Sequence, residues 1–201
     1  MQALDGLKVL DLSRVLAGPL CTQMLADLGA EVWKIESPRG DDTRHWGPPF
    51  EAGESAYFLS VNRGKQSVVV DLKDPRGATL VRQLAAQADV LVENFKRGDL
   101  ARYGLDYASL AADNPRLVYA SITGFGQHGP RADEPGYDVV AEALTGIMSV
   151  TGEPDGPPSK VGVAWIDVMT GLTATIGILA ALNARQASGR GQHIDLGLFD
   201  V

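Results

Sequence analysis

One carboxylate stands alone in an apolar stretch of this sequence. Asp167 is the only charged residue between Lys160 and Arg185, and it stands where a long helix is expected to begin. A carboxylate is favoured there, because it accepts hydrogen bonds from free backbone N–H groups and lies at the positive end of the helix dipole. An ionised carboxylate at such a place is also a candidate nucleophile. From the residues alone, helix capping and chemistry both remain open for Asp167.

Basic side chains follow two of the expected strands at the same level. They are Lys96, Arg97 and Arg102 after one strand, and Lys73 and Arg76 after another. The carboxyl ends of parallel strands share one edge of a sheet, where ligands usually bind. Cations gathered there suit a phosphate-bearing ligand. Without further information, a solvated helix face is the ordinary explanation of the same residues.

Two glycine-containing turns also follow strands. The segment from Gly124 to Pro130 holds three glycines and stands where a substrate loop would lie, although glycine clusters are also common in ordinary loops. The turn from Ser13 to Pro19 lacks the G-x-G-x-x-G spacing of nicotinamide and flavin sites. No phosphate loop of the G-x-x-x-x-G-K-[ST] type occurs either. The scattered histidines and the single Cys21 give no metal-site pattern.

The composition is that of an ordinary globular protein. Of 201 residues, 45% are hydrophobic and 21% charged, and the formal net charge of -7 argues against general attraction to nucleic acid or to anionic lipid. One cysteine cannot form an internal disulfide, so we expect a reducing compartment: the cytoplasm, or an organelle matrix if a targeting segment was removed. The N-terminus lacks the pattern of a signal peptide. The apolar stretch from Val161 to Leu182 is interpreted as a buried helix with its approach, not as a membrane span.

Short β-rich runs alternate with helical patterns along the chain, which predicts an α/β fold with a largely parallel sheet flanked by helices. The expected strands are Leu7 to Leu12, Glu31 to Glu36, Ser67 to Leu72, Asp89 to Glu93, Arg116 to Ile122 and Gln192 to Leu198. The expected helices are Gly18 to Leu28, Asp74 to Ala88, two short ones between Asp99 and Asp113, Tyr137 to Met148 and Asp167 to Gln186. The segment from Pro38 to Gly64 has few periodic apolar residues and is expected to be a long functional loop or arm.

A series of short motifs resembles the family III CoA-transferases, the group of formyl-CoA transferase and carnitine CoA-transferase. In order, they are Gly6-Leu-Lys-Val-Leu-Asp-Leu12, Ala17-Gly18-Pro19, Leu25-Ala-Asp-Leu-Gly-Ala-Glu-Val32, Lys34-Ile35-Glu36, Asn62-Arg63-Gly64-Lys65, Glu93-Asn94-Phe95, Asn114-Pro115-Arg116, Thr123-Gly124-Phe125-Gly126, Tyr137-Asp138, Ser188-Gly-Arg-Gly-Gln192 and Asp195. No single motif suffices, but together they are specific, and the resemblance covers essentially the whole chain.

This resemblance implies a Rossmann-like large domain in a protein whose two subunits interlock as a homodimer. Family members are roughly twice this length, so residues 1–201 would be the N-terminal part of the large domain. The small domain, a glycine-rich loop over the active site and a returning segment would lie outside this chain. The apolar residues at its end, Leu198-Phe199-Asp200-Val201, likewise suggest an incomplete polypeptide.

The resemblance also implies a reaction and its nucleophile. Family members move CoA from an acyl-CoA to a small carboxylic acid, and Asp167 matches the aspartate that becomes acylated. The substrate is a coenzyme A thioester, with no tightly bound cofactor and no metal. Residues that would surround CoA are Val15, Leu16, Ala17, Asp71, Leu72, Lys73, Asn94, Phe95, Lys96 and Arg102. Gly124, Gly126 and Tyr137 would border the substrate pocket.

One departure and two alternatives accompany this interpretation. Formyl-CoA transferase has an arginine at the position of Ser37, and whether Arg39 replaces it is left open. α-Methylacyl-CoA racemases pair the same aspartate with a histidine that would fall at Tyr137, so the tyrosine favours a transferase. A fragment that binds CoA without turnover is the alternative outside enzymology. Neither nucleic acid nor membrane is expected as a partner, and the acyl donor and acceptor acid are not identified.

Overall fold

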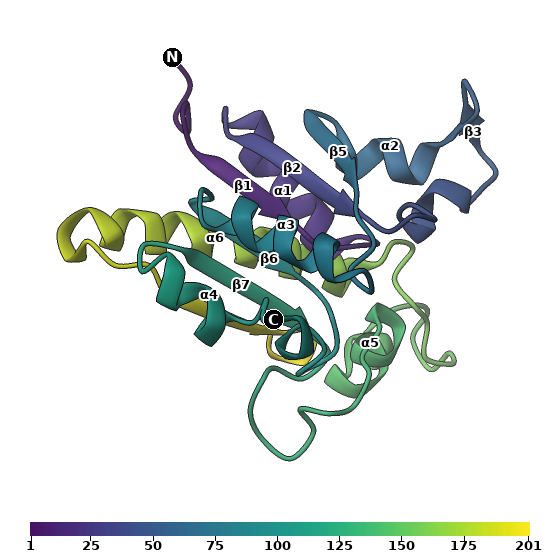
Figure 1. Cartoon of the computed structure of the whole chain (residues 1–201). Helices are drawn as coiled ribbons and strands as arrows, with labels where there is room; N and C mark the ends of the chain where they lie inside the picture. Colours follow the sequence, from purple (N-terminus) through teal and green to yellow (C-terminus); the bar gives the residue numbers. More distant parts are fainter.

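Six parallel strands form one sheet in the order β5-β2-β1-β6-β7-β8 (Figure 1). The computed structural model describes all residues from 1 to 201. The strands are β1 (Lys8–Asp11), β2 (Glu31–Glu36), β5 (Lys65–Val69), β6 (Val90–Glu93), β7 (Val118–Thr123) and β8 (His193–Gly197). Numbered along the chain, these six strands have the order 3-2-1-4-5-6 of the doubly wound Rossmann fold. The predicted α/β architecture is confirmed.

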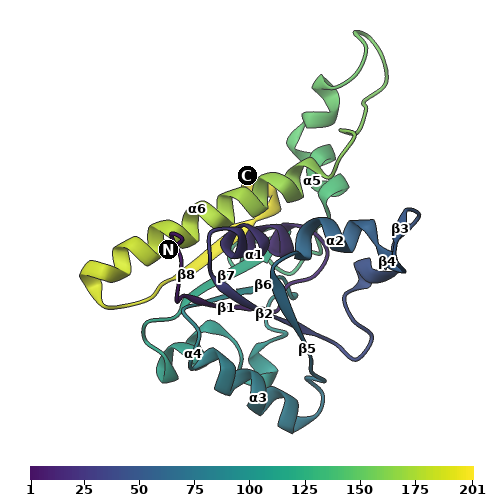
Figure 2. The same cartoon turned by 90° about the horizontal axis from the view of Figure 1, so that it is seen from above.

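Helices cover both faces of the sheet (Figure 2). They are α1 (Ala17–Asp27), α2 (Ala56–Asn62), α3 (Pro75–Ala85), α4 (Tyr107–Asp113), α5 (Asp138–Thr145) and α6 (Trp165–Ser188). α1 and α6 pack on one face, in a core that includes Cys21 and Ile178. α3 and α4 cover the other face, in a second core that includes Leu91 and Tyr119. α5 lies beyond the carboxyl end of the sheet, beside the start of α6.

The central strands form because their residues can be buried on both sides. β1 and β6 contribute Val9, Leu10, Leu91 and Val92 to the two cores in alternation, the pattern of strands covered by helices on both faces. The start of α3 also follows the sequence: Asp74 caps the helix by accepting a hydrogen bond from the N–H of Arg76 at 2.9 Å. Burial of the central strands and capping of α3 by Asp74 therefore both follow from the sequence.

The prediction of a long loop from Pro38 to Gly64 is wrong. This segment contains a short 3-10 helix at Asp42–His45, a hairpin of β3 (Phe50–Glu51) with β4 (Glu54–Ser55), and the helix α2. α2 spans only seven residues, too few for a periodic pattern to show. It is stabilised by its Ser55 cap and by burial of Phe58 and Val61.

Two predicted boundaries also differ from the structure. The strand predicted from Ser67 to Leu72 is β5, which already starts at Lys65 and ends at Val69. It is the edge of the sheet, and its first residues, Lys65 to Ser67, are polar, so the apolar run that starts at Val68 marks only the end of the strand. The last helix begins at Trp165, two residues before the predicted start. α6 is long and apolar enough to cross a membrane by length and composition, but Ala174 and Ile178 lie in the core, which agrees with the prediction of a buried helix.

Candidate active site

The start of α6 is capped by a carboxylate from another helix. The residue before α6, Ala164, offers no capping side chain. Instead, Asp138, the first residue of α5, accepts a hydrogen bond at Oδ1 from the backbone N–H of Asp167 at 3.1 Å. Asp167 is the third residue of the helix, so the capping role that the sequence left open for it belongs to Asp138.

Two acidic side chains lie at this helix start, and a phenol on α2 is close enough for their charges to affect its pKa. Burial raises the pKa of Asp167 to about 7, and the nearby charge of Asp138 adds to that effect. Burial also raises the pKa of Tyr57 on α2 to about 12, with further contributions from Asp167 and Asp138. Tyr57 is therefore a neutral hydroxyl at physiological pH, whereas Asp167 changes its charge near pH 7. Tyr57 was missed by the sequence analysis because it lies in the segment predicted as a loop.

The turn after β1 holds a strained backbone. Val15 has φ 71°, a left-handed conformation that is unusual for a β-branched residue. Asn94, which follows β6, accepts from the N–H of Arg14 at 2.9 Å and donates to its carbonyl oxygen at 2.7 Å. These two bonds bridge β1 and β6, the point where the strand order reverses and where ligands bind in such sheets. The side chain of Asn94, predicted to contact CoA, is thus engaged in holding the turn that carries Val15, Leu16 and Ala17.

Two buried ion pairs hold the backbone of this turn through hydrogen bonds to its carbonyl oxygens. Lys65 lies 2.9 Å from Asp11 and also donates to the carbonyl oxygen of Pro19 at 2.8 Å. Lys34 lies 2.9 Å from Asp41 and donates to the carbonyl oxygen of Ser13 at 2.8 Å. Burial raises the pKa of Asp11, but Lys65 and Lys34 outweigh it and hold that pKa well below its usual range. The network fixes both ends of the turn.

A close helix contact joins the two halves of the site. Gly171 lies one turn after Asp167, and a Cβ atom there would lie 2.8 Å from the carbonyl oxygen of Ala17 and 3.2 Å from Leu20. Only glycine lets α6 approach the start of α1 this closely. The contact places Asp167 within one helical turn of the residues predicted to surround CoA.

We expect Gly171→Ala to lower the free energy of unfolding by about 1–3 kcal/mol, because the backbone of Ala17 must move to admit the methyl group. Gly177→Ala on the same helix is the matched control, since a Cβ there would meet Ile194 at an ordinary 3.4 Å. That control is expected to be neutral or stabilising by up to about 1 kcal/mol, from higher helix propensity. Urea denaturation measures both, and equal effects would contradict the role of close packing.

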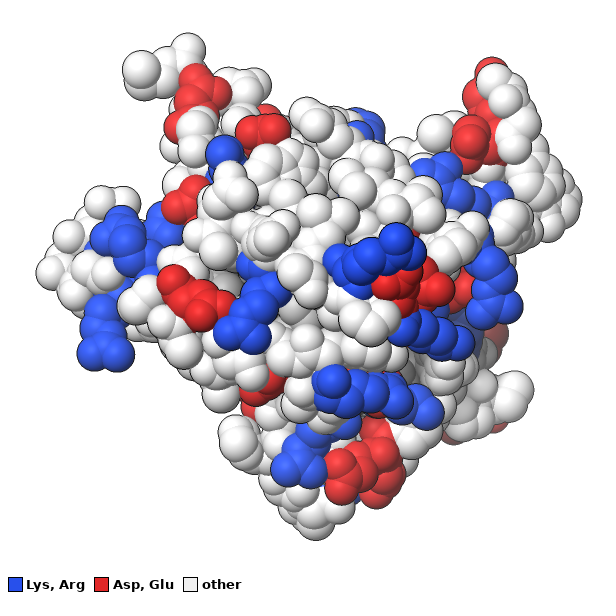
Figure 3. Space-filling view, in the orientation of Figure 1, with Lys and Arg blue, Asp and Glu red and all other residues white.

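Some of the predicted CoA residues line one cavity. It measures about 360 Å³ and is bordered by Leu72, Lys73, Arg82 and Arg102 on the face of α3. Arg102 also forms an ion pair with Asp99 at 2.6 Å. In Figure 3, basic side chains on this face are interspersed with acidic ones. Asp71 is exposed and accepts a hydrogen bond from the N–H of Lys73, shaping the turn after β5.

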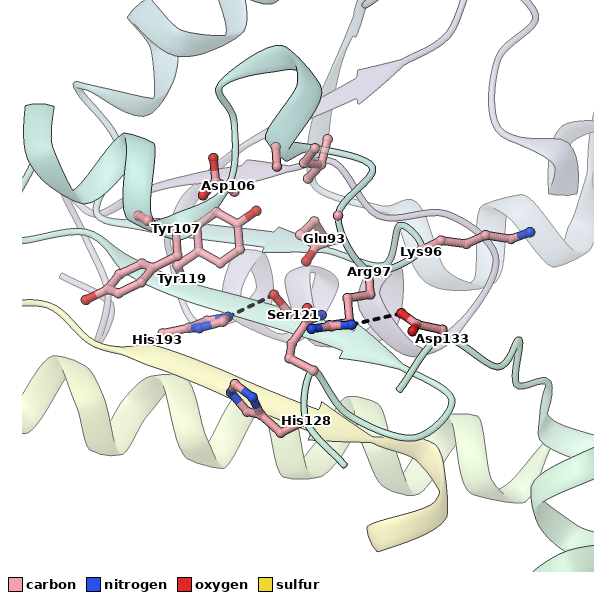
Figure 4. A pocket seen from close by; sticks show the side chains of 15 residues that line it. Glu93, Lys96, Arg97, Asp106, Tyr107, Tyr119, Ser121, His128, Asp133 and His193 are labelled. Carbon is pink, nitrogen blue, oxygen red and sulfur yellow. Dashed lines mark hydrogen bonds and ion pairs between the residues drawn. The ribbon is translucent and has the colours of Figure 1, made fainter. Parts of the chain in front are cut away.

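Lys96 does not share that cavity with Lys73 and Arg102. It lines a larger one of about 430 Å³, also on the α3 and α4 side of the sheet (Figure 4). There the hydroxyl of Ser121 lies 2.9 Å from Nε2 of His193, and burial raises the pKa of Glu93 to about 7. Asp167 is not among the lining residues, so size alone does not mark the reactive centre. Phe95 packs against the second core, below Arg14.

The predicted substrate-pocket residues lie near the start of α5. Gly124 packs directly against Gly136, since a Cβ on Gly124 would lie 2.5 Å from the Cα atom of Gly136. Tyr137 is 71% exposed and directly precedes Asp138. Gly126 is farther away, next to the carboxylate of Asp195, with φ 77°. Ser37 donates to the carbonyl oxygen of Gly40 at 3.1 Å, and the neighbouring Arg39 is exposed.

Comparison with known proteins decides the family. The sequence profile of "CoA-transferase family III" matches residues 4–201. The chain belongs to CoA-transferase family III. Within this family it is 56% identical to the succinate–glutarate CoA-transferase of Agrobacterium fabrum, with 98% of the chain and 51% of that protein aligned. It is 52% identical to the mouse succinyl-CoA:glutarate CoA-transferase, with 99% of the chain and 46% of that protein aligned.

A solved structure of a CaiB/BaiF family protein from Brucella suis has the same fold, with a TM-score of 0.97 and 56% identity. The match covers 99% of this chain and 54% of that one. The family III chain thus spans about half the length of the relatives it matches.

Proposed function

We propose that the protein containing this chain transfers CoA from an acyl-CoA to a carboxylic acid, with Asp167 as the nucleophile that carries the acyl group. The observation that supports this most directly is the position of Asp167. It is half-buried at the start of α6, and Gly171 packs that helix against the strained turn of Val15. The kinship with CoA-transferases supports the same reaction.

The reaction needs only one side chain to change its bonds. An oxygen of the Asp167 carboxylate attacks the thioester carbonyl, the C–S bond breaks, and CoA thiolate leaves an acyl–aspartyl anhydride. The thiolate attacks the Asp167 carbonyl carbon, which releases the donor acid and leaves an aspartyl-CoA thioester. The acceptor carboxylate attacks that thioester and expels the thiolate. The thiolate then attacks the acceptor carbonyl, giving the new acyl-CoA and restoring Asp167, with no net uptake of protons.

The raised pKa of Asp167 suits its attack on a thioester. A carboxylate is ordinarily much less basic than the thiolate it must displace, so anhydride formation is strongly uphill. Free thiols have a pKa of about 8.5 and aspartate of about 3.9, whereas burial and Asp138 raise the pKa of Asp167 to about 7. A more basic carboxylate is a better nucleophile. We therefore expect kcat/KM to rise with pH and to level off above about pH 7.

The relatives suggest the substrates. The proteins from Agrobacterium fabrum and mouse carry the names of succinate and glutarate, so we propose succinyl-CoA as donor and a short dicarboxylate such as glutarate as acceptor. Lys73 and Arg102 would hold the phosphates of CoA, while the turn of Val15, Leu16 and Ala17 would contact the rest. We also propose a cytoplasmic homodimer, in which residues 1–201 form the N-terminal part of the large domain.

Trapping the intermediate tests this function. The complete protein is incubated with succinyl-CoA, quenched in acid, digested and analysed by mass spectrometry. We expect a succinyl or CoA adduct on the peptide with Asp167, absent in Asp167→Asn, and transfer of CoA to glutarate. Binding without exchange would show an inert CoA-binding protein. With a chiral 2-methylacyl-CoA, loss of stereochemistry without exchange would show a racemase, and either result overturns the proposal.

A further inference from the structure

One exposed cation stands where the strand order of the sheet reverses. Arg14 directly follows the end of β1, and its backbone is fixed by Asn94, which accepts from its N–H at 2.9 Å and donates to its carbonyl oxygen at 2.7 Å. The side chain of Arg14 is 49% exposed. Ligands of doubly wound sheets bind at this reversal point. The guanidinium group therefore lies where a ligand is expected, although no role was predicted for it from the sequence.

The side chain of Arg14 contacts the segments that follow both neighbours of β1. Its Nη1 atom lies 2.9 Å from Oδ2 of Asp42, the first residue of the short 3-10 helix after β2. Its guanidinium carbon lies 6.0 Å from the centre of the Phe95 ring, which follows β6. β2 and β6 are the two strands that pair with β1. Arg14 thus links three segments at the carboxyl edge of the sheet.

The ion pair between Arg14 and Asp42 is easily replaced. Both side chains are about half exposed, and exposed ion pairs contribute little because water competes for both charges. The neighbouring Asp41 is different. It is buried 2.9 Å from Lys34, and it caps the 3-10 helix by accepting from the N–H of Thr43. The Asp42 side chain can therefore turn away while the backbone of the helix stays in place.

Two other cations lie at the same edge of the sheet. Lys73 follows β5 and Arg102 follows β6, and both line the cavity of about 360 Å³. Arg14 follows β1, which lies between those strands in the order β5-β2-β1-β6. A phosphate carries more charge than a carboxylate and offers more acceptor oxygens to the planar guanidinium group. A phosphate-bearing ligand at this edge is thus a stronger partner for Arg14 than Asp42 is.

We propose that Arg14 binds a phosphate group of CoA and that Asp42 is the anion it releases to do so. Asp42 pairs with Arg14 until CoA arrives. The guanidinium group then moves from the carboxylate to the phosphate, and Asp42 turns toward water. Only hydrogen bonds and ion pairs change partners in this step. Asp42 therefore competes with the substrate for one cation and lowers the affinity for CoA. This inference rests on the proposed function, because it takes CoA as the ligand.

Binding of CoA to the complete protein tests the role of Arg14. Isothermal titration calorimetry gives the Kd of wild type and of Arg14→Met. We expect the Kd to rise about 10- to 100-fold, the usual effect of losing a hydrogen bond between charged groups. The variant should keep the fold, since Asn94 holds the backbone of Arg14, and its urea midpoint checks this. An unchanged Kd would overturn the proposal.

Asp42→Asn is expected to act in the opposite direction. It frees Arg14 for the ligand, so the Kd for CoA should fall about two- to fivefold, which corresponds to the strength of an exposed ion pair. In the double variant Arg14→Met/Asp42→Asn, the second change should alter the Kd by less than about 1.5-fold, because there is no cation left to free. An equal gain with and without Arg14 would show that Asp42 merely repels the phosphates, and it would contradict the exchange.

Arg63 and Asp27 provide a matched control. They also form an exposed ion pair, but Arg63 lies two residues before β5, at the opposite edge of the sheet. Arg63→Met and Asp27→Asn should each leave the Kd for CoA within about 1.5-fold of wild type. If these variants changed the Kd as much as those at Arg14 and Asp42, general surface charge would explain the results and the specific contact would be refuted.

Shortened ligands identify the group that Arg14 binds. Pantetheine has no phosphate, so Arg14→Met should not weaken its binding, and a loss as large as with CoA would exclude a phosphate contact. Dephospho-CoA lacks only the 3′-phosphate: if Arg14→Met still weakens its binding, the partner is the pyrophosphate, and otherwise it is the 3′-phosphate. If wild type binds no CoA, the proposed function fails. If wild type binds and transfers CoA but the Arg14 and Asp42 variants match it, only this inference fails.

Discussion

Asp167→Asn is expected to lower kcat/KM for CoA transfer by about 10⁴- to 10⁶-fold, the range typical of losing a covalent nucleophile. The neutral amide cannot attack a thioester, and no neighbouring group can replace it. Asp138 is occupied in capping α6, and Tyr57 has a pKa of about 12, which leaves it protonated. The measurement is initial velocity with succinyl-CoA and glutarate across a range of pH.

The same variant should be at least as stable as wild type. The pKa of Asp167 is raised in the folded state, so the native protein binds more protons than the unfolded chain over the window from about pH 4 to 7. The group's contribution to stability therefore falls as pH rises through that window. Replacing it by a neutral amide should stabilise the fold above pH 7 by about 1–3 kcal/mol.

Wild-type turnover in Asp167→Asn would rule out the mechanism. Asp155→Asn, at an exposed aspartate between α5 and α6, is the control and should keep wild-type turnover.

Lys65→Met is expected to cost about 3–5 kcal/mol of folding free energy, the largest stability effect we predict for one side chain. The variant leaves Asp11 as a buried charge without its nearest cation, and it removes all three hydrogen bonds of the ammonium group. These go to Asp11, the carbonyl oxygen of Pro19 and the side chain of Asn62. Because the network fixes the turn of Val15, we also expect weaker acyl-CoA binding.

Two further variants make that measurement specific. Arg82→Met breaks the exposed ion pair with Asp113 and should cost less than about 1 kcal/mol. The double variant Asp11→Leu/Lys65→Met removes both buried charges and should recover part of the loss. Urea denaturation at neutral pH compares the set. Equal costs for Lys65→Met and Arg82→Met would show that the buried pair has no special role.

Most of the fold could be predicted from the sequence because its central strands are apolar. The two central strands are buried on both faces at Val90 to Val92 and at Val9 to Leu10, so their apolar sequences predict strands directly. Edge strand β5 begins with three polar residues, Lys65, Gln66 and Ser67. Gln66 and Ser67 are exposed at the edge of the sheet, and Lys65 bonds to Asp11, so none of them adds to an apolar core. Its position could therefore be predicted only approximately.

The candidate site was partly visible in the same way. Asp167 stands out because no other charge lies near it in the sequence. Asp138 appears in the sequence only within the motif Tyr137-Asp138, without a role, and Tyr57 carries no signal. Folding brings both near Asp167 from positions 29 and 110 residues away along the chain. Asn94 illustrates a further limit. Its presence near the turn that carries Val15 could be expected, but its two hydrogen bonds to Arg14 are a property of the folded backbone.

The strand order has a consequence for how the protein is made. β1 pairs with β6, and Val9 lies opposite Val90. The middle of the sheet therefore cannot form until β6 has been synthesised. During synthesis, β1, β2 and β5 emerge first and expose an unpaired edge of β1 on the ribosome, an arrangement that invites aggregation or chaperone binding. Asn94 and Arg14 bridge this junction between β1 and β6. A nascent chain thus acquires its ligand-facing turn only after the two halves of its sheet have met.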